Sequence, residues 1–188
     1  MPKNCTILMV RHGEKPQQGV TLSVAGQARA QAYVAWFAHY ILRNTNGAMP
    51  ATAAALQIQH LFATADSASS QRPRLTITPL AQALGKEIHD QFADDEHHKL
   101  AKYILANEKY NGDTLLICWH HGKILELAAE LGVQNLPPAS NWPQKWPEQV
   151  FGWTLQLVFD ANGALDPTQT LCFSQQLMYD DYGQNPPG

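Results

Sequence analysis

The chain has 188 residues, an apolar fraction of 45% and a formal net charge of −3, values that exclude a disordered segment and fit one globular domain. No basic stripe or polybasic run is present, so the charge pattern gives no support to binding of nucleic acid or of an anionic membrane. The three cysteines are odd in number, far apart and without a Cys-x-x-Cys pair, which argues against a disulfide framework and a zinc knuckle.

The first quarter of the sequence predicts a buried strand followed by a long helix. Cys5–Val10 is a continuous apolar run, the pattern of a strand buried on both faces. Leu22–Arg43 has apolar residues at helical spacing, and Ser23 is suited to cap its start. No apolar leader precedes the first strand and no apolar run reaches the length of a membrane span. We therefore expect a cytoplasmic protein.

The next part of the chain predicts a loop, a second strand and a second helix. Asn44–Ala55 is rich in small and polar residues and is expected to be a loop. Ile58–Ala63 is a strand candidate. A helix is expected from about Pro73 to Gly85, since Gly85 suits the position just after a helix end. Pro79 inside this helix lacks an N–H and is expected to kink or break it.

The rest of the chain continues the alternation of strands and helices. The expected elements are an extended piece at Glu87–Phe92, a helix at Asp94–Asn107, a buried strand at Thr114–Trp119, a helix at Lys123–Leu131, an irregular stretch at Gln134–Pro147, and strands at Val150–Phe159 and Leu171–Met178 joined through Asp160–Gly163. This alternation predicts an α/β fold, namely a three-layer αβα sandwich with a mostly parallel central sheet and a C-terminal edge hairpin. We expect residues 1–188 to form a single domain, with a disordered tail after about residue 182.

Two of the predicted strands end in histidine. One is followed by Arg11-His12-Gly13 and the other by His120-His121-Gly122. In a parallel α/β sheet, ligands bind beyond the carboxyl ends of the strands. Between these two strands in sequence, a polar stretch supplies Arg72, and the planar fork of an arginine matches the oxygens of a phosphate. If the strands are neighbours, both histidine runs and Arg72 meet in one phosphate site.

The runs that carry these residues resemble the histidine phosphatase superfamily, also called phosphoglycerate-mutase-like. Four elements occur in the family's order between Ile7 and about Gly132. They are VRHGEKP, then Leu22-Ser23-x-x-Gly26-x-x-Arg29-Ala30, then Arg72-Pro73-x-x-Thr76-x-x-Pro79-Leu80-Ala81-x-x-Leu84-Gly85, then a strand followed by His-x-Gly. A lone Arg-His-Gly is a weak signal, whereas four ordered elements at predicted strand and helix boundaries are specific.

The resemblance implies a phosphatase in which His12 attacks phosphorus and forms a phosphohistidine that water then hydrolyses. A neutral imidazole nitrogen is a competent nucleophile near neutral pH. Arg11, Gly13, Arg72 and the second histidine would bind the phosphate and stabilise the charge that develops on its oxygens. These cationic groups supply what Mg²⁺ supplies elsewhere, so no metal or other cofactor is expected.

Two assignments stay open at this point. An ungapped match makes His120 the pocket histidine and leaves His121 where phytase-like members carry an acidic proton donor, whereas a shift of one residue makes His121 the pocket residue. The general acid is Asp90, Asp94 or Glu14. The first two follow the helix that ends in Leu-Gly, and the third is close to the nucleophile.

The stretch Lys86–Asp113 holds one helix and no inserted segment large enough to cap a substrate. This disfavours a phosphomutase and favours a small phosphatase with an open site. The expected partner is a phosphorylated small molecule or a phosphoprotein, with no nucleic acid and no membrane. A phosphomutase of the same fold and a non-catalytic module that binds a phosphorylated ligand are the alternatives.

Overall fold

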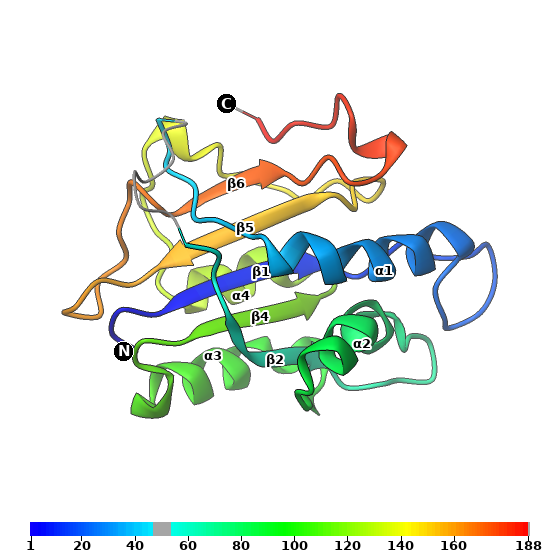
Figure 1. The fold of residues 1–188 in the computed structure, drawn as a ribbon, viewed down its shortest axis with the longest axis horizontal. Coiled ribbons are helices and arrows are strands. Elements are labelled where there is room, and N and C mark those ends of the chain that lie inside the picture. The colour runs from blue at the N-terminus through cyan, green and yellow to red at the C-terminus, as the bar shows by residue number, and fades with distance from the viewer. Residues whose placement is uncertain (47–53, 188) are drawn as a thin grey trace.

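The computed structural model describes residues 1–46 and 54–187. Within these ranges six strands form one sheet in the order β3–β2–β4–β1–β5–β6 (Figure 1). The strands are β1 (Thr6–Arg11), β2 (Ile58–Thr64), β3 (Ile88–Phe92), β4 (Thr114–Trp119), β5 (Trp153–Val158) and β6 (Leu171–Ser174). The α-helices are α1 (Val24–Ala38), α2 (Arg72–Leu84), α3 (His97–Leu105) and α4 (Ile124–Glu130), and short 3-10 turns occupy Asp94–Glu96, Glu108–Tyr110, Pro138–Ser140 and Tyr179–Asp181.

Strands β1 to β4 run parallel, and β5 and β6 form an antiparallel hairpin on the side of β1. Because successive side chains of a strand point to opposite faces, β1 feeds two separate cores. Ile7 and Met9 pack with residues of α3 and α4, while Leu8 and Val10 pack with residues of α1 and α2. Two helices therefore cover each face of the sheet, and the predicted αβα sandwich with an edge hairpin is confirmed.

Helix α1 begins where the sequence predicts, because Ser23 accepts a hydrogen bond from the N–H of Gly26 at 3.1 Å. It ends at Ala38, five residues before the predicted end at Arg43. The reason is a tertiary contact with the buried side chain of Gln156, which bonds both the N–H (3.0 Å) and the carbonyl (2.8 Å) of Arg43. These bonds hold residues 39–43 alongside β5 and out of the helix. Of the predicted loop Asn44–Ala55, residues 47–53 lie outside the described residues.

Helix α2 continues through Pro79, so the break expected there does not occur. A proline removes one hydrogen bond of the ladder, and the burial of Ile77 and Leu80 on either side of it stabilises the continuous helix. The helix ends as predicted, with Gly85 in the left-handed conformation at φ 61°, where glycine carries no Cβ penalty.

Several element boundaries in the second half of the chain differ from the prediction, and β5 begins at Trp153 and not at Val150. The helix expected at Asp94–Asn107 divides into a 3-10 turn followed by α3. The hairpin link is longer than Asp160–Gly163, because after that turn Leu165 pairs back with Phe159 before the chain reaches β6. Strand β6 ends at Ser174, since the backbone leaves the extended conformation at Gln176, whose φ is 55°.

The chain after Tyr182 is described to Pro187, and the indole N–H of Trp153 donates to the carbonyl of Gln184 at 2.5 Å. The disordered tail stays a prediction. No helix in the described part of the chain is both long and apolar enough to cross a membrane.

Candidate functional site

The two histidine runs meet because their strands are direct neighbours. Strands β1 and β4 pair in parallel with Arg11 opposite Trp119, so the residues that follow leave the sheet at the same edge. The backbone N–H of His12 donates to the carbonyl of Trp119 at 3.1 Å. The rings of His12 and His120 lie edge to face with centroids 5.0 Å apart.

Burial and one hydrogen bond define the state of the His12 ring. Its Nδ1 lies 2.7 Å from the carbonyl oxygen of Gly13, and because a carbonyl only accepts, Nδ1 carries the proton. The side chain is 3% exposed, and burial, helped by the neighbouring His120 ring and the positive charges of Arg11 and Arg72, lowers the pKa of His12 to about 2. The imidazole is therefore neutral at physiological pH, with an unprotonated Nε2.

Thr76 connects the loop after His12 to the start of α2. Its hydroxyl accepts a hydrogen bond from the N–H of Gly13 at 2.8 Å and donates to the carbonyl of Arg72 at 2.7 Å. The Arg72 guanidinium donates to the carbonyls of Gly19 (3.2 Å) and Ser69 (3.3 Å). Its Nε is buried without a partner among the described residues. The positive charge of Arg72 also lowers the pKa of both His12 and His120.

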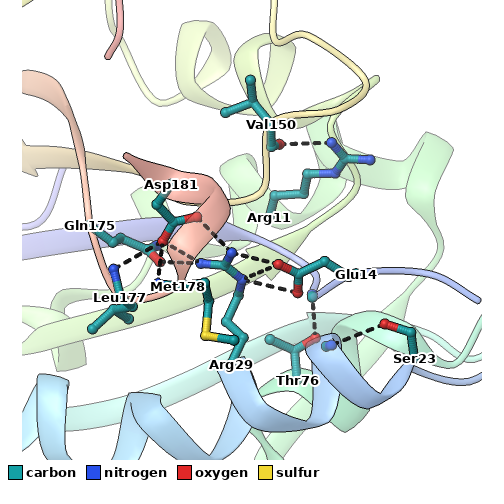
Figure 2. Close-up of polar contacts among 12 residues, drawn as sticks. Arg11, Glu14, Ser23, Arg29, Thr76, Val150, Gln175, Leu177, Met178 and Asp181 are labelled. Atoms are coloured by element: carbon teal, nitrogen blue, oxygen red, sulfur yellow. Dashed lines mark hydrogen bonds and ion pairs between the residues drawn. The ribbon is translucent and has the colours of Figure 1, made fainter. Parts of the chain in front are cut away.

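Arg11 is fully buried and anchors the loop at residues 147–151. One of its terminal nitrogens donates to the carbonyls of Glu148 (2.5 Å), Val150 (2.8 Å) and Pro147 (3.3 Å), and Figure 2 shows the bond to Val150. Its guanidinium lies 3.8 Å from the ring centroid of Phe151. Burial lowers the pKa of Arg11 to about 10, so it stays charged at neutral pH. One nitrogen of the Arg11 guanidinium, which the sequence predicts to bind phosphate, thus holds this loop.

The two consecutive histidines face different surroundings. His120 lies against His12, and burial together with the charge of Arg72 lowers its pKa to about 4. Burial and the positive charge of Arg11 lower the pKa of His121, and the carboxylate of Glu148 opposes this lowering. Its Nδ1 is buried without a partner among the described residues. Of the two consecutive histidines, His120 is therefore the one whose ring lies against His12.

Of the three carboxylates considered as proton donors, Glu14 and Asp90 lie near arginines, whereas Oδ1 of Asp94 is buried without a hydrogen-bond partner among the described residues. Glu14 accepts hydrogen bonds from the buried Arg29 at 2.6 and 3.1 Å. Asp90 lies 3.8 Å from Arg74. Asp94 is half-buried, burial raises its pKa, and the charges that act on it come mainly from His97 and Lys123. The structure thus brings together Arg11, His12, Gly13, Arg72 and His120, while no hydrogen bond joins these carboxylates to His12 among the described residues.

Several residues of the site were not identified as such from the sequence. Phe151 forms an aromatic wall, with its ring centroid 6.0 Å from that of His12. Thr76 and Arg29 lie within the sequence runs that carry the family resemblance, and this was the only indication that they belong to the site. Asp181 gave no signal, because its partner Arg29 lies 152 positions earlier in the chain. Within the described ranges, no three His, Cys, Asp or Glu side chains group in a way that would hold a metal ion.

The chain has a mostly parallel sheet whose adjacent strands β1 and β4 are followed by His12 and His120, and this fold matches that of solved phosphatases, as the sequence resemblance predicted. No family model matches the chain, and no curated protein matches it in sequence.

Solved structures, in contrast, match the chain. The chain superposes on a mycobacterial glucosyl-3-phosphoglycerate phosphatase in complex with inorganic phosphate with a TM-score of 0.53 at 16% identity, over 89% of this chain and 98% of that one. For the same enzyme in complex with VO3 the TM-score is 0.51 at 14% identity, over 89% and 96% of the two chains. Mycobacterial hydrolase 1 aligns with a TM-score of 0.53 at 16% identity, over 86% and 96%. At such identities the likeness concerns the fold.

Proposed function

We propose that this chain is a phosphatase that hydrolyses phosphomonoesters through a phosphohistidine intermediate on His12. The observation that carries the proposal is the His12 ring, which is buried and neutral and has its proton on Nδ1. A neutral Nε2 beside two guanidinium groups combines a nucleophile with the charges that a phosphoryl group requires. The solved phosphatase that shares this fold, in complex with inorganic phosphate, supports the same reading.

In the proposed first step, Nε2 of His12 forms a bond to phosphorus while the bond to the ester oxygen breaks. The electron pair leaves with that oxygen. Arg11, Arg72 and His120 stabilise the charge on the other phosphoryl oxygens. In the second step water attacks phosphorus, the phosphorus–nitrogen bond breaks, and inorganic phosphate is released with His12 neutral again. No step requires a metal ion.

The surroundings of the carboxylates favour a particular substrate chemistry. Glu14 is ion-paired with Arg29, Asp90 lies 3.8 Å from Arg74, and no contact joins Asp94 to His12 among the described residues, so protonation of the leaving oxygen is the weakest part of the site. An aryl phosphate, whose leaving oxygen needs little protonation, should therefore react faster than an alkyl phosphate. A phosphorylated small molecule or a phosphoprotein side chain would fit an uncapped pocket.

The test is phosphate release from a panel of aryl and alkyl phosphates by the purified protein, with acid-quenched trapping of phosphohistidine. His12→Ala should abolish both signals, while His39→Ala, at an exposed histidine near the far end of α1, should leave them unchanged. Unchanged turnover in His12→Ala would refute the proposed nucleophile.

The absence of a carboxylate partner for His12 among the observed contacts favours one alternative, a non-catalytic module that binds a phosphorylated ligand. Measurable phosphate binding without turnover or trapped phosphohistidine would select that module over the phosphatase.

A further inference from the structure

A network of buried charges connects the loop after His12 to the C-terminal segment Gln175–Asp181. Arg29 on α1 lies at its centre, and all three nitrogens of its guanidinium donate hydrogen bonds. Towards the site they reach Glu14 at 2.6 and 3.1 Å, and on the other side Asp181 at 2.7 and 3.0 Å and Gln175 at 3.2 Å (Figure 2). The Arg29 and Asp181 side chains are each 1% exposed.

Asp181 is itself fixed within the C-terminal segment. Its Oδ2 accepts hydrogen bonds from the N–H groups of Leu177 (3.0 Å) and Met178 (3.1 Å). The carboxylate also packs onto Gly152, where a Cβ atom would overlap it. The N–H of Gln175 donates to the carbonyl of Gly152 at 2.7 Å. A carboxylate held by so many contacts can act as a rigid support for the arginine that it binds.

At the other end, Glu14 belongs to the peptide unit that controls the His12 ring. The carbonyl that accepts from His12 Nδ1 is that of Gly13, and it forms one planar unit with the N–H of Glu14. A rotation of this peptide plane, which moves the N–H of Glu14, therefore turns the carbonyl away from the imidazole.

The start of α1 encloses the peptide units on both sides of Glu14. The N–H of Ser23 donates to the carbonyl of Glu14 at 2.9 Å. A Cβ atom on Gly26 would lie only 2.8 Å from the nitrogen of Glu14 and 2.5 Å from its oxygen. The backbone of Glu14 is thus fixed on the α1 side, while the ion pair with Arg29 fixes its side chain.

We propose that Asp181 is a positioning residue, which acts through Arg29 and Glu14 to hold the Gly13–Glu14 peptide unit and thereby keeps the proton of His12 on Nδ1. Among the contacts of the described residues, the Asp181 carboxylate bonds Arg29 and two backbone N–H groups and not His12 itself. Its effect on turnover rests on the proposed function, because only a nucleophilic Nε2 makes the position of that proton matter for catalysis. Loss of this support should slow the chemical step more than it weakens substrate binding.

The experiment compares Asp181→Asn, which removes the charge and keeps the volume, with Asp180→Asn at the exposed neighbour. Nitrogen-15 NMR of the His12 ring reports which nitrogen carries the proton, independently of any turnover. We expect one tautomer, protonated on Nδ1, in the wild type and in Asp180→Asn, and a mixture of tautomers in Asp181→Asn. With an aryl phosphate, kcat should fall roughly ten- to a hundredfold in Asp181→Asn, with little change in KM.

Glu14→Gln serves as the second variant if Asp181→Asn does not fold, and it should give the same mixture of tautomers. When both fold, the double variant should be no worse than the more affected single variant, because the two residues act in one chain of contacts. A folded Asp181→Asn with the wild-type tautomer and wild-type kcat would overturn the inference. A wild type without turnover would instead refute the proposed function, and the NMR comparison would still decide the role of Asp181.

Discussion

The buried position of Arg29 leads to a quantitative prediction about stability. In Arg29→Met the aliphatic stem is largely kept, but Glu14 and Asp181 lose their shared cation. Asp181 would then be a carboxylate that is 1% exposed and whose remaining hydrogen bonds come from two backbone N–H groups. Removal of one partner from a buried ion pair costs about 3–5 kcal/mol. For a domain of this size, that corresponds to a fall in Tm of about 6–20 °C.

The assay is urea unfolding at pH 7, with Arg74→Met as the matched control. Arg74 pairs with Asp66 in the same bidentate manner, but both side chains are about one-third exposed, so its loss should cost about 1 kcal/mol or less. If the two variants lose the same free energy of unfolding, the buried network contributes no more than a surface ion pair and the reasoning is wrong.

The pH dependence gives a second readout of the same variant. Burial opposes ionisation of Asp181, but hydrogen bonds from Arg29 outweigh it and lower its pKa in the folded wild type. A lowered folded pKa contributes stability that is present above the ordinary aspartate pKa and is lost as pH falls through the folded value. The difference between wild type and Arg29→Met should therefore be largest near pH 7 and shrink steadily below pH 4. A difference that stays constant between pH 7 and pH 3 would contradict this assignment.

Three further predictions concern the loop after β1. Thr76→Val should lower the free energy of unfolding by about 1–3 kcal/mol, because the buried N–H of Gly13 loses its acceptor; Thr78→Val, whose hydroxyl bonds only within the helix, should cost clearly less. In an NMR titration of the phosphate-free protein, the His12 ring should show no protonation between pH 4 and 8, since its pKa is lowered to about 2; a midpoint near 6.5 would disprove the buried neutral state. Gly26→Ala should lower the free energy of unfolding by about 1–3 kcal/mol, because its Cβ would meet the backbone of Glu14. The same displacement should lower kcat, and an unchanged kcat would mean that the loop after β1 tolerates it.

Much of the arrangement around His12 follows from local sequence signals. Strands β1 and β4 are fully buried apolar runs, and such runs predict parallel strands covered on both faces. Because the carboxyl ends of neighbouring parallel strands share one edge, the proximity of His12 and His120 follows once the strands are recognised. The arginine after the second strand is predicted by the same reasoning.

The features that could not be predicted from the sequence depend on contacts between distant segments of the chain. The early end of α1 depends on Gln156, whose side chain takes the backbone bonds of Arg43. The use of Arg11 to hold backbone carbonyls of residues 147–150 is likewise invisible before the loop is placed. Asp181 stands in a stretch without helical or strand periodicity, so only the folded chain reveals its link to Arg29.

The central place of β1 in the sheet has a consequence for how the protein folds during synthesis. This strand leaves the ribosome before both of its partners, since Thr6 pairs with Thr114 on one side and with Val158 on the other. Contacts at such large sequence separation form slowly, and an apolar strand that waits for partners is exposed to aggregation in the meantime. A circular permutant in which β1 follows β4 and β5 would remove this wait, and its higher yield of refolded protein would measure what the natural chain order costs.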